Sequence, residues 1–205
     1  MESYRLEGQT FVIDDYDRKP AFSSFLPGLA GVKGIPLWTF YTNRGQGMNS
    51  FGIDNKGNAI MEFNSANTAF ENTQVKGFRT FLKIDGEYYE PFFTYEKEAK
   101  RQMRMNKNSF KIIETNEKYG IEVTVNYYVL PNESIGALVR QVSVKNIGDS
   151  AKEVQVIDGL PKIITYGIAN GEFKEMSNLF KSWADIRNLE NKVPYYTLRA
   201  STKDS

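Results

Sequence analysis

Hydrophobic and polar residues alternate along several stretches of this chain, most regularly between residues 121 and 129. One face of that stretch would carry Ile121, Val123, Val125, Tyr127 and Val129, and the other would carry Glu122, Thr124 and Asn126. Successive side chains of a β-strand point to opposite faces of the sheet, so this alternation predicts a long strand with one buried face.

A second alternating stretch, 78–84, is followed by Asp85-Gly86 and then by residues 87–90. An Asp-Gly pair between two strand-like segments predicts a tight hairpin, because a type I′ turn needs a positive φ at both central residues. Further strands are predicted at 36–43, 50–54, 59–63, 109–115, 137–146, 153–157 and 195–200. Successive strands separated by turn residues predict a mainly β fold, an antiparallel β-sandwich.

One helix is predicted late in the chain, where Met176, Leu179, Phe180, Trp183 and Ile186 follow helical spacing. Such a stripe of apolar side chains is typical of a helix that packs against the core. The basic stretch 97–107 is interpreted as a solvated connector.

Arg140 shares a predicted strand face with apolar residues. Because an inward-facing arginine usually has a carboxylate partner, we expect a structural ion pair there.

The composition excludes several kinds of chemistry. The 205 residues include no cysteine and no histidine, so a Ser-His-Asp triad, a thiol nucleophile and a zinc site with cysteine or histidine ligands are ruled out. The charges nearly cancel, with 26 basic and 25 acidic residues, which argues against nucleic acid or anionic lipid as a partner.

We expect no membrane association and a cytoplasmic location. The polar, acid-containing start of the chain does not match a secretory signal, and no apolar run approaches the roughly 20 residues needed to cross a bilayer. The lack of cysteine suits a reducing compartment.

The candidate chemistry is concentrated in a glycine-rich region, 23–52, which holds six of the 16 glycines. Within it, Asn43, Arg44, Gln46 and Asn49 carry amide and guanidinium groups, which suit hydroxyl-rich or anionic ligands. A plain hairpin loop is the competing interpretation. The Gly-x-Gly fragment lacks the third glycine and the following helix of a dinucleotide site.

Three other features have two interpretations each. The acidic residues Asp14, Asp15 and Asp17 do not match a calcium loop and are expected in a solvated turn, so no metal site is predicted. The 28 aromatic residues either reflect β propensity or serve to stack on sugar rings. The glutamates flanking aromatics could form a glycosidase pair only at a defined separation across a cleft. They are Glu87, Glu90, Glu96 and Glu98.

Three stretches of the chain are specific in sequence. One runs from Gly28 to Gly47 and ends in Thr42-Asn43-Arg44-Gly45-Gln46-Gly47, and the others are Ala59-Ile60-Met61-Glu62-Phe63 and Gly77-Phe78-Arg79-Thr80-Phe81. In these stretches the sequence resembles the N-terminal region of family 94 glycoside phosphorylases, which include cellobiose phosphorylase-like enzymes. Within the family, the 1,2-β-oligoglucan phosphorylase branch is the most similar.

The resemblance implies a β-sandwich of the galactose mutarotase-like (supersandwich) kind. Residues 1–205 would form a single N-terminal domain, incomplete at its C-terminal end and lacking the (α/α)6 catalytic barrel. Family members cleave β-linked gluco-oligosaccharides with inorganic phosphate and invert the anomeric centre to give α-glucose 1-phosphate. The acid that donates the proton belongs to the barrel, so no catalytic residue and no cofactor is expected here.

The expected function is therefore that of a non-catalytic domain that shapes the active-site mouth and the dimer interface of a homodimeric phosphorylase. Arg44 and Gln46, with Asn43 and Asn49 behind them, are the expected substrate contacts. The alternatives are a free-standing glycan-binding module and a small independent glycosidase. A mutarotase would work with histidine and glutamate, and the lack of histidine argues against it.

Overall fold

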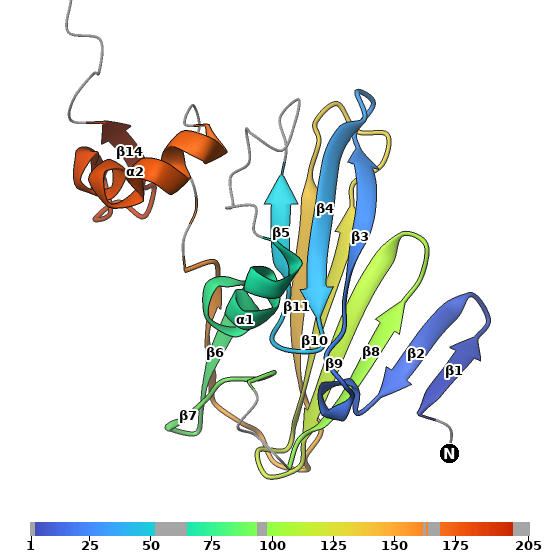
Figure 1. Ribbon diagram of the computed structural model, residues 1–205. Helices are drawn as coiled ribbons and strands as arrows, with labels where there is room; N and C mark the ends of the chain where they lie inside the picture. Colours follow the sequence, from blue (N-terminus) through green and yellow to red (C-terminus); the bar gives the residue numbers. More distant parts are fainter. Residues whose placement is uncertain (1–2, 52–64, 94–97, 162, 164–168, 199–205) are drawn as a thin grey trace, which may run out of the picture.

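The computed structural model describes residues 3–51, 65–93, 98–161, 163 and 169–198. Within these residues the chain forms fourteen strands and two α-helices, and every strand pair is antiparallel (Figure 1). The fold is therefore mainly β, as predicted. The predicted strand 59–63 and Glu96 lie outside the described residues.

The largest sheet has six strands in the order β1-β2-β8-β9-β10-β11. Their bounds are β1 Tyr4–Glu7, β2 Thr10–Asp14, β8 Lys100–Met105, β9 Ser109–Asn116, β10 Ile121–Val129 and β11 Leu138–Asn146. The long strand predicted from the alternation at 121–129 is β10, and its odd-numbered residues from Ile121 to Tyr127 are buried. Each such side chain stabilises the fold by about 1.5–3 kcal/mol.

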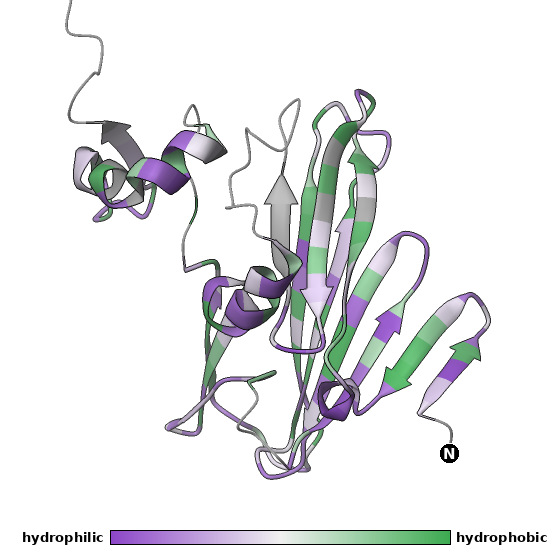
Figure 2. Cartoon of the chain, in the orientation of Figure 1, coloured by the Kyte–Doolittle hydropathy of each residue, from purple (hydrophilic) through white to green (hydrophobic). Residues whose placement is uncertain are grey.

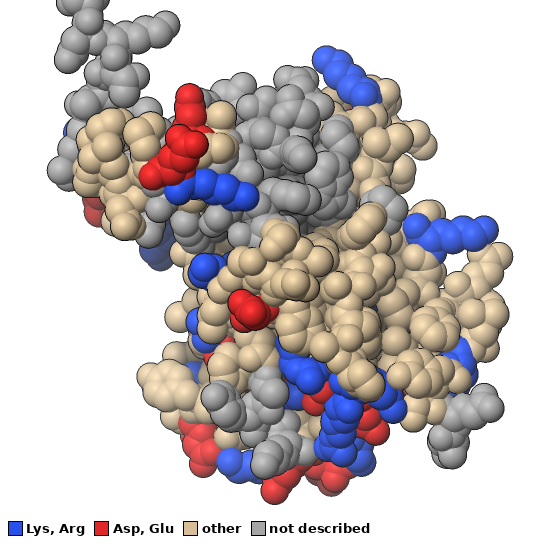
Figure 3. Space-filling view, viewed as in Figure 1, with Lys and Arg blue, Asp and Glu red and all other residues tan. Residues whose placement is uncertain are grey.

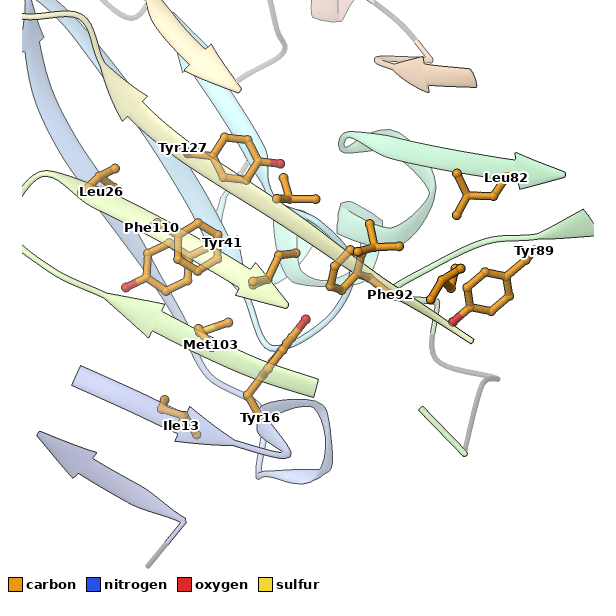
Figure 4. Close-up of a cluster of buried hydrophobic side chains, with 14 of the residues drawn as sticks. Ile13, Tyr16, Leu26, Tyr41, Leu82, Tyr89, Phe92, Met103, Phe110 and Tyr127 are labelled. Atoms are coloured by element: carbon orange, nitrogen blue, oxygen red, sulfur yellow. The ribbon is translucent and has the colours of Figure 1, made fainter. Parts of the chain in front are cut away.

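Two three-stranded sheets form the opposing layer. One is β3 Ser23–Ala30, β4 Ile35–Thr42 and β5 Met48–Phe51, and the other has the order β12-β6-β7, with β12 Val154–Gly159, β6 Arg79–Ile84 and β7 Glu87–Tyr89. Tyr41 of β4 and Leu82 of β6 belong to the same core cluster as Phe110 and Val125 of the large sheet (Figure 4). Both small sheets thus pack on one face of the large sheet, which makes an antiparallel β-sandwich.

Aromatic rings fill the centre of this sandwich. The ring centroids of Tyr41 and Phe110 lie 4.1 Å apart and those of Phe110 and Tyr127 lie 5.7 Å apart, in stacked arrangements (Figure 4). Figure 2 shows hydrophobic residues along the strands of both layers. The many aromatics of the sequence therefore contribute in part to the core, as their β propensity suggests.

The predicted Asp-Gly hairpin is confirmed between β6 and β7. Asp85 has a φ of 48° and Gly86 a φ of 92°, so both central residues adopt the positive values that a type I′ turn needs. β12 completes this sheet along the other edge of β6, with Ile157 opposite Phe81.

Helix α1, Ala66–Lys76, was not predicted. Its sequence has few apolar side chains, and only Ala69 and Thr73 are buried, so it carries almost no periodic signal. Ala69 packs against Phe40, which places α1 on the outer side of the β3-β4-β5 sheet.

The predicted late helix is α2, Asn170–Trp183, which lies to one side of the sandwich (Figure 1). The helix ends before Ile186, which lies instead in the hairpin of β13 Ala184–Arg187 and β14 Tyr195–Leu198, opposite Tyr196. The prediction that Met176 and Leu179 pack against the core was wrong. Both side chains are exposed, because α2 contributes no residue to the main core cluster.

The interpretation of 97–107 as a solvated connector was also wrong. Residues 100–105 form β8 in the middle of the large sheet, and Arg101 is buried there. A run of basic residues concealed the strand, since an inward-pointing arginine breaks the apolar alternation that predicts a strand.

Candidate functional site

The loop 43–47, which carries three of the four predicted substrate contacts, joins β4 to β5 at the lower end of the β3-β4-β5 sheet as drawn in Figure 1. Figure 3 shows basic and acidic side chains gathered at this end. The loop is turned by Thr42, whose hydroxyl donates to the carbonyl oxygen of Arg44 at 2.8 Å and accepts from its backbone N–H at 3.0 Å. These two hydrogen bonds fix the backbone where the loop begins.

Asn43 is fully buried, with 0% of its surface exposed. Its Nδ2 lies 3.2 Å from the carbonyl oxygen of Tyr16, 2.9 Å from that of Lys19 and 3.1 Å from that of Pro20. Its Oδ1 accepts from the backbone N–H of Phe22 at 3.2 Å. Asn43 therefore fixes the segment between β2 and β3 to the end of β4.

Arg44 is half-buried, and its Nη1 donates to the carbonyl oxygens of Asp17 at 2.6 Å and of Asn43 at 2.7 Å. The guanidinium thus lies across the same segment that Asn43 holds. Among the predicted contacts whose side chains the structure describes, Arg44 alone keeps part of its surface in solvent.

Gln46 belongs to a group that we call the Arg140 cluster, which is formed by Gln46, Thr80, Tyr127, Arg140 and Asp158. Gln46 has 2% of its surface exposed, and its Oε1 accepts from Arg140 Nη2 at 2.5 Å and from Thr80 Oγ1 at 3.0 Å. Thr80 also lies 2.6 Å from Asp158 through its hydroxyl. The cluster joins the loop, β6, β10, β11 and β12.

Arg140 pairs with the carboxylate of Asp158, which confirms the expected ion pair on that strand face. The guanidinium also donates from Nε to the phenol oxygen of Tyr127 at 3.1 Å and lies 4.8 Å from the centroid of the Phe78 ring. Burial raises the pKa of Tyr127 to about 12, although the charge of Arg140 opposes that rise. Tyr127 is therefore a neutral hydrogen-bond donor at physiological pH, and its hydroxyl donates to the carbonyl oxygen of Gln46.

A second buried group, the Arg101 cluster, consists of Asp17, Tyr89, Arg101, Glu114 and Asn116. Arg101 Nε lies 2.5 Å from Glu114 Oε2, and its Nη1 lies 2.7 Å from Asp17 Oδ2. Burial alone would lower the pKa of Arg101, but the charge of Glu114 and the hydrogen bond to it, together with the charges of Tyr16 and Asp17, outweigh burial and the pKa is raised. Tyr89 donates to Glu114, and both burial and the charge of that carboxylate raise the pKa of Tyr89.

Both clusters hold residues 90–93, which follow β7 and which we call the strap. Gln46 Nε2 lies 3.5 Å from the carbonyl oxygen of Pro91. Glu114 Oε2 accepts from the backbone N–H of Phe92 at 2.7 Å, and Arg101 Nη2 donates to the carbonyl oxygen of Phe93 at 2.8 Å. Phe92 is buried in the core at a φ of 64°, so these side chains stabilise a backbone conformation that is unusual for phenylalanine.

Close packing accounts for two glycines in this region. A Cβ added to Gly45 would lie 3.1 Å from Cα of Gln74 in α1, and Gly45 has a φ of 64°. A Cβ added to Gly77 would lie 2.4 Å from the carbonyl oxygen of Gly47. The loop is thus packed beneath the C-terminal end of α1.

Of the predicted contacts, Asn43, Arg44 and Gln46 are brought to one end of the sandwich. Asn49 lies in β5, where its backbone pairs with Thr39, and its side chain is outside the described part of the structure. The prediction that Asp14, Asp15 and Asp17 lie in a solvated turn was wrong for Asp17, because this residue pairs with buried Arg101.

The sequence reasoning missed Arg101, Glu114 and Tyr127 as members of polar clusters. Glu114 had a usable signal, because it continues the inward face of a strand after Phe110 and Ile112. A buried carboxylate of this kind requires a partner.

Within the described residues there is no group of three or more acidic side chains placed to hold a metal ion. The two α-helices there are too short or too polar to span a membrane. Fold and site together define the molecule as an antiparallel β-sandwich with two ion-pair clusters, of which the Arg101 cluster is buried and the Arg140 cluster is partly exposed at Asp158. No family model matches the sequence, and no curated protein matches it significantly.

Proposed function

We propose that this chain is the non-catalytic N-terminal domain of an inverting β-glucan phosphorylase, in which it shapes the active-site mouth and the dimer interface. The supporting observation is that side chains of the loop 43–47 hold other segments of the chain in place. This loop belongs to the stretch that resembles the family. Asn43 and Gln46 are committed to holding other segments of the chain. That is the role that a supporting domain requires of such residues.

Arg44 is the residue of this loop proposed to contact the saccharide or phosphate of the whole enzyme. Its guanidinium is partly exposed, and only Nη1 has hydrogen-bond partners among the described residues. A guanidinium with unused donors suits the hydroxyls of a sugar or the oxygens of phosphate.

A phosphorolysis assay tests the proposal. The native protein, isolated from its source with an antibody against this chain, is given β-1,2-linked gluco-oligosaccharides and inorganic phosphate. Release of α-glucose 1-phosphate is expected from the native protein, and none is expected from the 205-residue chain alone. Release by the 205-residue chain, or no release by the native protein, would overturn the proposal.

A free-standing glycan-binding module is the second candidate function. One observation favours it, namely the exposed rings of Phe81 and Tyr88 on the outer face of the β12-β6-β7 sheet. Saturable binding of β-linked gluco-oligosaccharide by a native protein that releases no glucose 1-phosphate would support this candidate over the first.

A further inference from the structure

The outer face of the β12-β6-β7 sheet exposes large side chains that the core does not use. Tyr88 is 80% exposed, Ile157 74% and Phe81 39%. The register places Phe81 opposite Ile157, and Lys83 opposite Tyr88. Since residues two apart on a strand share a face, these four side chains stand on one surface.

Cations hold the two aromatic rings of this surface. Lys83 Nζ lies 5.5 Å from the centroid of the Tyr88 ring, and Arg79 Cζ lies 4.6 Å from that of Phe81. Arg79 is itself fixed by Glu90 through two hydrogen bonds of 2.7 and 2.8 Å. Aromatic rings held in this way lose little conformational entropy when a ligand stacks on them.

The size of the surface indicates a small ligand. Six residues along β6 and three strands across give an area of roughly 20 by 14 Å, or about 300 Å². A stable protein–protein interface needs about 800 Å² from each partner. A second copy of this chain would therefore gain too little on this surface, whereas an oligosaccharide of a few rings would cover it.

The chemistry of the surface matches a β-linked glucan. Its sugar rings carry their substituents at the rim, which leaves flat C–H faces that stack on aromatic rings. Phe81 and Tyr88 are diagonal neighbours across β6 and β7, about 7–8 Å apart between Cα atoms. Gln155, Lys83 and Glu90 lie around them and supply hydrogen-bonding groups for the hydroxyls.

We infer that this surface, formed by Phe81, Lys83, Tyr88 and Ile157, is a binding site for β-linked gluco-oligosaccharides. The inference rests on the carbohydrate function proposed above, and it names a site that is separate from the loop 43–47. Stacking supplies most of the affinity, so the site tolerates different β linkages and discriminates against α-linked chains, whose curvature prevents two rings from lying flat.

Titration of the full chain with β-linked gluco-oligosaccharide, followed by calorimetry and by NMR shifts, tests the inference. Tyr88→Ala is expected to lower the affinity by at least about tenfold, and Tyr88→Phe to keep it within about threefold, because the phenylalanine ring still stacks. Phe25→Ala is the matched control, since Phe25 is a 60% exposed aromatic residue on β3. It should bind as the wild type does.

Two results would overturn the site. One is an affinity that Tyr88→Ala leaves unchanged, and the other is an absence of binding at millimolar oligosaccharide. Neither result would contradict the phosphorylase proposal, because that proposal is tested separately by release of glucose 1-phosphate from the native protein. Equal affinity for an α-linked oligosaccharide would also contradict the stacking geometry.

Discussion

Gln46 and Arg140 are 94 residues apart in the sequence, and Oε1 of Gln46 accepts a hydrogen bond of 2.5 Å from Nη2 of Arg140. This contact brings the loop 43–47 to β11 and leaves the amide with its oxygen fully used by Arg140 and Thr80. Gln46 therefore acts as a fixed support within the sandwich. Arg44, two residues earlier, remains half-exposed.

The two residues should respond differently to replacement by leucine. Gln46→Leu removes the closest acceptor of Arg140 Nη2, which keeps only the Thr80 hydroxyl at 3.2 Å, so the free energy of unfolding is expected to fall by about 1.5–3 kcal/mol. Arg44→Leu should cost less, because water can solvate the carbonyl oxygens that its partly exposed guanidinium contacts. Urea denaturation of both variants measures the difference. Equal losses of unfolding free energy would show that Gln46 supports the fold no more than Arg44 does.

The Arg101 cluster provides a second test. Arg101→Met removes the cation that neutralises buried Glu114, and breaking a buried pair from one side costs about 3–5 kcal/mol. The matched control is Lys100→Ala, because Lys100 makes an ion pair with Glu117 in which both side chains are largely exposed. That change should stay within about 1 kcal/mol of the wild type. Equal losses of stability in Arg101→Met and Lys100→Ala would contradict the burial of the Arg101–Glu114 pair.

Much of the sandwich could be predicted because its core strands alternate cleanly. β10 and the β6-β7 hairpin are examples, since each follows from side-chain period and turn chemistry alone. β8 could not be predicted in the same way, because Arg101 occupies an inward position whose partners come from residues 17 and 114. Local pattern contains no information about such distant partners.

The candidate site was harder to predict than the fold. Asn43, Arg44 and Gln46 drew attention as polar residues among glycines, and the sequence alone could not separate ligand binding from internal support. The partners of Gln46 lie on β6 and β11, far along the chain. The glycines were ambiguous for the same reason, since the segment that packs on Gly45 belongs to α1.

Asn43 should be important for stability. Asn43→Leu keeps a similar volume but leaves the backbone N–H of Phe22 and the carbonyl oxygens of Lys19 and Pro20 without this partner, whereas the carbonyl oxygen of Tyr16 still accepts from the backbone N–H of Lys19. Because unsatisfied buried polar groups cost about 1–3 kcal/mol each, we expect a loss of about 2–4 kcal/mol. Asn108→Leu, at an exposed turn, is the control. A loss no greater than that of the control would mean that water replaces these hydrogen bonds.

Gly77 tests the close approach of the loop to α1. A Cβ at this position would meet two carbonyl oxygens at 2.4 and 2.5 Å, although the backbone φ of −77° is ordinary. Gly77→Ala is therefore expected to cost about 1–3 kcal/mol through overpacking. Gly171→Ala, where a Cβ meets nothing within 4 Å, should change stability by no more than about 0.5 kcal/mol. Thermal unfolding of both variants gives the comparison.

Stability at alkaline pH should depend on Tyr127. Its pKa is raised to about 12 in the folded protein, above the value of about 10 that applies to an unfolded chain. The unfolded state therefore loses this proton first, and the stabilisation present below pH 10 is lost as the pH rises toward 12. The contribution is about 1.4 kcal/mol per pH unit over that window.

Tyr127→Phe removes this titration, so the fall in the free energy of unfolding between pH 10 and pH 12 should be shallower in the variant than in the wild type. Burial also raises the pKa of Tyr16 and of Tyr89, so the variant should keep part of the slope. Tyr88→Phe serves as the control, since the Tyr88 side chain is largely exposed and should leave the slope unchanged. Urea denaturation at several pH values measures the slopes. Parallel slopes for wild type and Tyr127→Phe would mean that the phenol at the centre of the Arg140 cluster reaches solvent in the folded state.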